Sequence, residues 1–308
     1  MHELAAGDLS LRVSLMFSYR RLTQSAATLL PMIAVAAHAD FSVWACSVVL
    51  DQPANLAGSA IGELALAHLA DPAGGERYRL HDLVHGFANT LPGPENLQAT
   101  AERRMLHALL LTTHTAAPLL IARHHPDRIR IDVTSEHGLS FASPAEALAW
   151  FDTERDNLAA MVRLATQRGR HVEAWQLACE LRAFFGAQHR FDEYTALLAV
   201  ALESARALGA PLAEAKVQEQ MAVSFSETGQ FEQSLALNTV VRELYAACGS
   251  SYAVLGAQPA WGDPRTHRRP RRCRRVPLAG PRGAGIRHVR GQRRRDPDQP
   301  RRDLRQAR

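Results

Sequence analysis

The feature that most constrains the fold is a series of amphipathic helical segments separated by short turns. The first begins with a helix-start signal, because Ser143 can cap it, Pro144 suits the first helical position, and Glu146 can reach back to complete a capping box. Apolar side chains then recur at helical spacing. The predicted helices cover residues 143–169, 171–186, 191–209, 211–227 and 230–248. Helices joined by such short turns pack as antiparallel neighbours, so the sequence predicts a helical-repeat array.

A more specific pattern of large apolar, small and aromatic residues lies within this array. Its members are Met221, Ala222, Phe225, Gly229, Phe231 and Ser234, and the first pair recurs further along the chain as Leu255 and Gly256. The order of these residues and the interval from Met221 to Leu255 resemble the tetratricopeptide repeat. The resemblance implies stacked helix pairs whose groove binds a protein or peptide. The alternative is ordinary helical packing with a chance period.

The sequence changes character at residue 259. From Ala260 to Arg308 the chain has 17 arginines and 4 aspartates, whereas the preceding residues have 19 basic and 27 acidic side chains. The segment 259–308 has no apolar periodicity, and its Arg, Pro and Gly content predicts disorder. It could be a phosphate-binding arm, a solvated linker, or the translation of GC-rich DNA in the wrong frame. Because Pro259 stands where the repeat expects an aromatic residue, we favour a frame break near Gln258.

The front of the chain shows a different organisation of short helical patterns. These patterns cover residues 11–22, 24–37, 41–50 and 55–69, and a turn at 71–76 separates Leu69 from Tyr78. The turn predicts a two-stranded β-wing, followed by a helix over 83–91. The residues Ser18, Tyr19 and Leu22, and the block Tyr78, Leu80, His81, Asp82 and Leu83, resemble the winged-helix part of the NB-ARC module in STAND signalling ATPases. The likeness is strongest to antibiotic-biosynthesis regulators of the SARP type.

The resemblance gives His81 and Asp82 a possible role in nucleotide sensing. In that family the histidine reaches the phosphates of bound ADP and holds the protein in its inactive state. The alternative is that Asp82 caps a helix beginning at Leu83 and that His81 faces solvent. A Walker loop, Gly-x4-Gly-Lys-Ser/Thr, does not occur, since the only lysine, Lys216, is followed by Val217. We therefore expect no cofactor in this chain, and phosphate sensing by His81 only where another chain supplies the ATPase core.

Other site classes find little support in the sequence. We find no nucleophile elbow and no paired acid–base motif, so we expect neither catalytic residues nor an enzyme. The four cysteines are far apart without metal-ligand spacing, so we expect reduced thiols in the cytoplasm and no metal site. There is no long apolar run and no signal-peptide pattern, so we expect no membrane contact. Residues 1–95 carry five arginines against nine acidic side chains, which argues against specific nucleic-acid binding.

The sequence therefore predicts a mainly α protein in four parts. These are a winged-helix domain over 1–95, a helical connector and loop over 96–142, tetratricopeptide-like repeats over 143–258, and a disordered tail over 259–308. The predicted function is that of a non-catalytic regulatory part, with hinge and repeat sensor, of a STAND-type signalling ATPase or transcriptional regulator. One alternative is a free-standing repeat adaptor that binds a protein or peptide. The other is a DNA-binding winged-helix regulator, which the acidic charge of residues 1–95 disfavours.

We predict that limited proteolysis trims the chain to near residues 250–260 and leaves a helical core, because the tail lacks apolar side chains to bury. We also predict that one alternative reading frame after Gln258 encodes a repeat with its aromatic and glycine positions filled. Mass spectrometry of the resistant product and the gene sequence in all three frames test both statements. A protease-resistant tail with no repeat in either other frame would instead indicate a functional arm.

Overall fold

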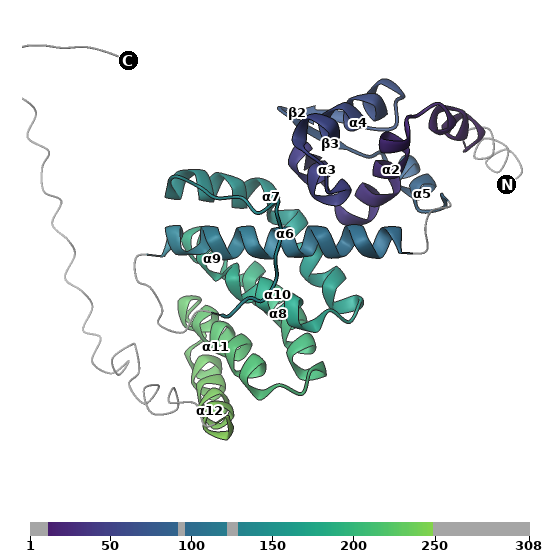
Figure 1. Cartoon of the computed structure of the whole chain (residues 1–308). Coiled ribbons are helices and arrows are strands. Elements are labelled where there is room, and N and C mark those ends of the chain that lie inside the picture. Colours follow the sequence, from purple (N-terminus) through teal and green to yellow (C-terminus); the bar gives the residue numbers. More distant parts are fainter. Residues whose placement is uncertain (1–11, 92–95, 122–128, 249–308) are drawn as a thin grey trace, which may run out of the picture. The chain divides into compact units, whose positions relative to one another are not determined.

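The computed structural model describes residues 12–91, 96–121 and 129–248, and it confirms the predicted fold class: mainly α, with a small β-wing and helical repeats (Figure 1). All of these residues belong to one compact unit, Met1–Gln258. Within them no helix is long and apolar enough to cross a membrane. The tail from residue 259, with the expected frame break and disorder, lies outside the described residues.

The front of the chain, called here the winged module (residues 12–91), is a small helical cluster with a sheet at one edge. Its helices are a segment over 12–20, α2 (Gln24–Ala36), α3 (Val43–Leu50), α4 (Ala54–Leu66) and α5 (Asp82–Ala88). The apolar faces of α2 and α4 meet in the core, where Leu29, Leu30, Ile33, Ile61 and Leu64 are fully buried. The predicted helical patterns of this region are thus present.

The wing has three strands rather than the predicted two. The strands β1 (Asp40–Ser42), β2 (Asp71–Gly74) and β3 (Arg77–Arg79) form an antiparallel sheet in the order β1-β3-β2. The prediction of a turn over 71–76 was wrong, because most of that segment is β2. Gly74 and Gly75 have φ values of 100° and 58°, so the chain reverses in a shorter turn than we expected. The three-residue strand β1 is too short to show a period in the sequence.

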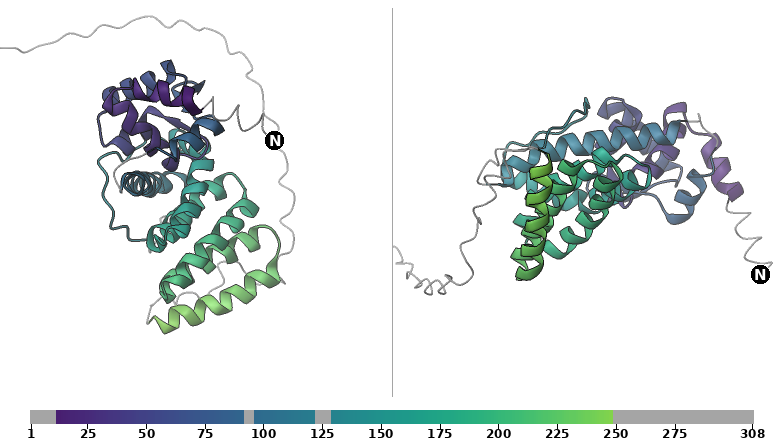
Figure 2. Two further views of the ribbon diagram at one scale, coloured as in Figure 1. Left: turned by 90° about the vertical axis from the view of Figure 1, so that its right-hand side faces the viewer. Right: turned by 90° about the horizontal axis from the view of Figure 1, so that it is seen from below.

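Helix α6 (Leu97–Leu120) lies between the winged module and the later helices (Figure 2). It contacts α2 and α3 on one side and α7 and α8 on the other. Its core-facing residues Leu106, Leu109 and Leu110 are buried. The helix therefore supplies a shared hydrophobic core for both parts of the chain.

The repeat region consists of helices joined by short turns. They are α7 (Pro144–Gln167), α8 (His171–Glu180), α9 (Arg182–Ala187), α10 (Phe191–Ala207), α11 (Pro211–Glu227) and α12 (Phe231–Ala247). The helix predicted over 171–186 is interrupted at Leu181, which separates α8 from α9.

The turns of the repeat region follow one another at equal intervals along the sequence. The left-handed residues Gly169, His189, Gly209 and Gly229 stand in these turns. A helix pair spans two intervals, as from Gly169 to Gly209 or from His189 to Gly229. This period of the described helix pairs is longer than the interval from Met221 to Leu255 on which the tetratricopeptide period was based.

The capping box predicted at the start of α7 is present in a modified form. The Oγ of Ser143 accepts a hydrogen bond from the backbone N–H of Glu146, at 3.2 Å. The carboxylate of Glu146 accepts in return from the backbone N–H of Ala142, at 2.9 Å, rather than from that of Ser143. Two backbone donors at the helix start are satisfied in this way.

We predict that Ser143→Ala lowers the free energy of unfolding by about 1 kcal/mol, because the N–H of Glu146 loses its acceptor. Urea denaturation followed by circular dichroism measures the change. Ser59→Ala is the matched control: Ser59 is exposed inside α4, where alanine is the better helix former, so this variant should be neutral or slightly more stable. A control that loses as much stability as Ser143→Ala would refute the capping role.

Candidate functional site at the junction of the winged module and the repeats

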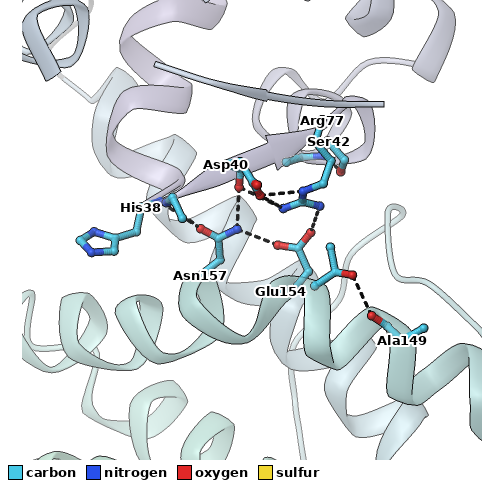
Figure 3. Close-up of polar contacts among 10 residues, drawn as sticks. His38, Asp40, Ser42, Arg77, Ala149, Glu154 and Asn157 are labelled. Carbon is cyan, nitrogen blue, oxygen red and sulfur yellow. Dashed lines mark hydrogen bonds and ion pairs between the residues drawn. The ribbon is translucent and has the colours of Figure 1, made fainter. Parts of the chain in front are cut away.

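A largely buried polar cluster joins the wing to the first repeat helix, and Arg77 lies at its centre (Figure 3). Arg77 opens β3 opposite Ser42 of β1, and its long side chain reaches diagonally to Asp40, two residues earlier on that strand. Its Nε donates to Asp40 Oδ1 at 2.6 Å, and one Nη donates to the Asp40 carbonyl at 3.0 Å. The other Nη donates to Glu154 Oε1 of α7, also at 2.6 Å. A single guanidinium thus holds β1, β3 and α7 together.

Asn157 completes the cluster one turn after Glu154 on α7. Its Nδ2 donates to Glu154 Oε2 at 2.7 Å and to the Asp40 carbonyl at 2.8 Å. Its Oδ1 accepts from the backbone N–H groups of His38 and Ala39, at 3.0 and 3.2 Å. We call Asp40, Arg77, Glu154 and Asn157 the junction network. Each member contacts more than one partner, so the network closes only in a single arrangement of wing and helix.

Burial makes this network energetically important. The side chain of Glu154 is 6% exposed and that of Arg77 is 17% exposed. Burial disfavours the charged form of Arg77, but the hydrogen bonds and charges of Glu154 and Asp40 outweigh this cost and raise the pKa of Arg77. The guanidinium of Arg77 therefore keeps its positive charge inside the junction. Removing one partner would leave a desolvated charge, which costs far more than losing an exposed ion pair.

An aromatic row crosses the same junction. Trp44 of α3 contacts Trp150 of α7, and neighbouring rings continue into the repeats with centroids 5.0–6.5 Å apart. The row consists of Trp44, Trp150, Phe151, Phe184, Phe185 and Tyr194. Offset and edge-to-face ring pairs of this kind add to the stabilisation from burial. The winged module and α7–α10 are therefore linked by packing as well as by the junction network.

The predicted phosphate-sensing residues lie apart from the junction network. His81 is the N-cap of α5, and its Nδ1 accepts from the backbone N–H of Leu83 at 3.4 Å. Asp82 is the first residue of α5 and not its cap, so this part of the alternative was wrong, whereas its other part, a His81 that faces solvent, agrees with the structure. Both side chains are exposed. His81 can therefore be reached by a partner molecule.

The residues of the repeat pattern come together in the hairpin of α11 and α12. Ala222 and Ser234 are buried against each other, and Ser234 Oγ donates to the Ala222 carbonyl at 2.8 Å. Gly229 provides the left-handed turn, after which the N–H of Gln230 donates to the Phe225 carbonyl at 2.8 Å. Met221 packs against the main core, whereas Phe231 is 55% exposed. Leu255 and Gly256 lie outside the described residues.

Sequence reasoning did not identify the junction network. One usable signal was present: Glu154 and Asn157 lie in the apolar stripe of α7, between Phe151 and Met161. A carboxylate in the buried face of a helix requires a charged or hydrogen-bonding partner. The sequence alone does not say that this partner is Arg77, 77 residues earlier in the chain.

Groups of three or more side chains that could hold a metal ion are absent from the described part of the chain. Free Cys46 and Cys179 are buried, and burial raises the pKa of the Cys46 thiol to about 12. These thiols therefore stay protonated, and their geometry does not favour nucleophilic chemistry.

Comparison with known proteins finds regulators. Over 243 residues, 77% of the chain, the sequence is 28% identical to the regulatory protein AfsR of Streptomyces griseus and covers 24% of it. Over 169 residues, 53% of the chain, it is 30% identical to the regulatory protein AfsR of Streptomyces coelicolor and covers 17% of it. The chain spans about a quarter or less of these curated relatives. No family model and no solved structure matches.

We predict that Glu154→Ala lowers the free energy of unfolding by about 3 kcal/mol, because the substitution leaves the half-buried charge of Arg77 with Asp40 alone. Arg155→Ala, on the same helix, removes an exposed pair with Asp156 and should change stability by about 0.5 kcal/mol or less. Urea titration of both variants measures the difference. Similar losses in the two variants would contradict a special role for the junction network.

Proposed function

We propose that this chain is a non-catalytic regulatory part of a SARP-type transcriptional regulator of the STAND class. In this proposal the winged module acts as a hinge in signal transduction, and the helical repeats act as the sensor that binds a protein or peptide. The similarity to AfsR over most of the chain supports a regulator. The described geometry contributes a winged module and a helical array that are joined by the junction network. That network is the single observation on which the mechanism rests.

The proposed mechanism follows from how the junction network is connected. Arg77 binds both Asp40 and Glu154, and Asn157 binds both Glu154 and the backbone of β1. A partner on the repeats cannot move α7 relative to the wing by a small amount without breaking several of these bonds together. The two parts therefore move as one body until the network opens. Such a two-state contact is what a regulatory switch requires.

His81 is the candidate contact between the winged module and a nucleotide-binding partner. Its exposed ring lies at the start of α5, where Nδ1 accepts from the backbone N–H of Leu83 and leaves Nε2 toward solvent. The chain itself has no Walker loop, so the phosphate would belong to ADP held by an ATPase core on another chain. An imidazole N–H can donate to a phosphate oxygen in this position.

A free-standing repeat adaptor is the second candidate function, and one observation favours it. On α12 the side chains of Phe231 and Leu235 are 55% and 71% exposed. Apolar side chains exposed one turn apart are common at protein-binding surfaces. The adaptor would need neither His81 nor an ATPase core, so a test of His81 separates the two functions.

We predict that the chain alone neither hydrolyses ATP nor binds ADP tightly, but associates with an ADP-loaded ATPase core of a SARP-type regulator. His81→Asn should weaken this association about ten-fold or more, because asparagine keeps the helix cap and removes only the imidazole. Isothermal titration calorimetry measures the binding of ADP to the chain and the association of each variant with the ATPase core.

His189→Asn is the control, since His189 is exposed in a left-handed turn that asparagine tolerates, far along the chain from the wing. This variant should bind like the parent chain. Association that is unchanged in His81→Asn would contradict the phosphate contact. Failure of the core to associate would favour the adaptor, and sequence-specific DNA binding by residues 1–258 would favour a DNA-binding regulator.

A further inference from the structure

A cleft of about 560 Å³ opens beside the junction network. The end of α2 and helix α5 line it from the winged module, and the start of α6 and the second half of α7 line it from the other side. This volume is within the range of small-molecule sites in proteins. The cleft is therefore large enough for a metabolite and too small for a folded partner.

The floor of the cleft is apolar and its rim is polar. Buried Ala36 and Met161 and half-buried Leu164 belong to the floor. The rim carries side chains that can donate hydrogen bonds: His38, His85, Asn89, Gln98, Arg163 and Gln167. Such a lining suits a molecule with an apolar body and a polar head.

The charge of the rim indicates which polar head fits. The carboxylate of Glu102 lines the cleft, but Arg168 neutralises it through contacts of 2.9–3.2 Å from Nε and Nη. Arg163, whose side chain is exposed, also lines the cleft and makes no hydrogen bond or ion pair with any other residue that the structure describes. Among these residues one guanidinium is thus left without a counterion. The cleft is locally basic, although residues 1–259 have a net negative charge.

We propose that this cleft binds a small organic anion, with its acidic head on Arg163 and its apolar body on the floor. Guanidinium groups bind carboxylates and phosphates through two parallel N–H donors. The neighbouring amides of Gln98 and Gln167 supply further donors. The molecule would be a carboxylic acid or a phosphate monoester, since both offer two acceptor oxygens that one guanidinium can bind at the same time.

The position of the cleft gives such a ligand a regulatory role. Asn157 belongs to the cleft lining and also to the junction network. The ligand would contact the winged module through His38 and His85 and the repeats through Arg163. It would therefore stabilise the closed junction by mass action. This effect needs no ATPase core, so its failure would leave the proposed function untouched.

Calorimetry and thermal denaturation of the full chain test the proposal with four probes: benzoate, phenyl phosphate, inorganic phosphate and neutral benzyl alcohol. We expect benzoate or phenyl phosphate to bind and to raise the Tm, and phosphate alone and benzyl alcohol to bind about ten-fold more weakly or not at all. Arg163→Gln should weaken binding of the organic anion about ten-fold or more.

Arg155→Gln is the matched control on α7, because Arg155 pairs with Asp156 and does not line the cleft. It should bind the probes like the parent chain. Both variants keep the arginine-rich residues after 259, so any binding there cancels in the comparison. The proposal is overturned if neither organic anion binds, if benzyl alcohol binds equally well, or if Arg163→Gln binds like the control.

Discussion

The guanidinium of Arg77 is the group on which the rest of the structure depends. It is 17% exposed and cannot lose its proton, so it must find counterions inside the protein. Asp40 provides one from the neighbouring strand, and Glu154 provides the other from α7. The need to pair the charge of Arg77 thus fixes the position of the wing relative to α7. The shared core around α6 supplies most of the buried apolar surface.

Local signals predicted the helices well, because their causes are local. Ser143 and Pro144 mark a helix start, and Gly169, Gly209 and Gly229 mark the ends. The strand β1 could not be predicted, because its three residues form a strand only by pairing with β3. The junction network could not be assembled either, since it joins residues that are far apart in the sequence and carry no shared motif. Only the polar residues in the apolar stripe of α7 indicated that a buried partner was needed.

The repeat pattern was informative within one hairpin, whereas the period taken from it stays a prediction. The contact of Ala222 with Ser234 and the turn at Gly229 are local features of α11 and α12. The predicted period relied on Leu255 and Gly256, which are outside the described range. Within that range the turns recur at equal intervals, and two such intervals together are longer than the distance in sequence from Met221 to Leu255. His189 occupies the turn position that glycine has in the other turns. A histidine with φ of 54° costs about 1 kcal/mol relative to glycine, so the packing of the neighbouring helices must hold this turn in place.

A junction built from charges suits regulation better than one built from apolar groups alone. The hydrophobic effect has no preferred direction, so apolar burial specifies the relative orientation of two elements only through the fit of their side chains. The hydrogen bonds of Asn157 to the backbone of His38 and Ala39 have fixed directions and fail together if α7 shifts. Replacing a buried ion pair by apolar residues is often neutral for stability, so stability alone does not explain this one. What the junction network adds is a single register between wing and repeats. The proposed hinge would need that property more than extra stability.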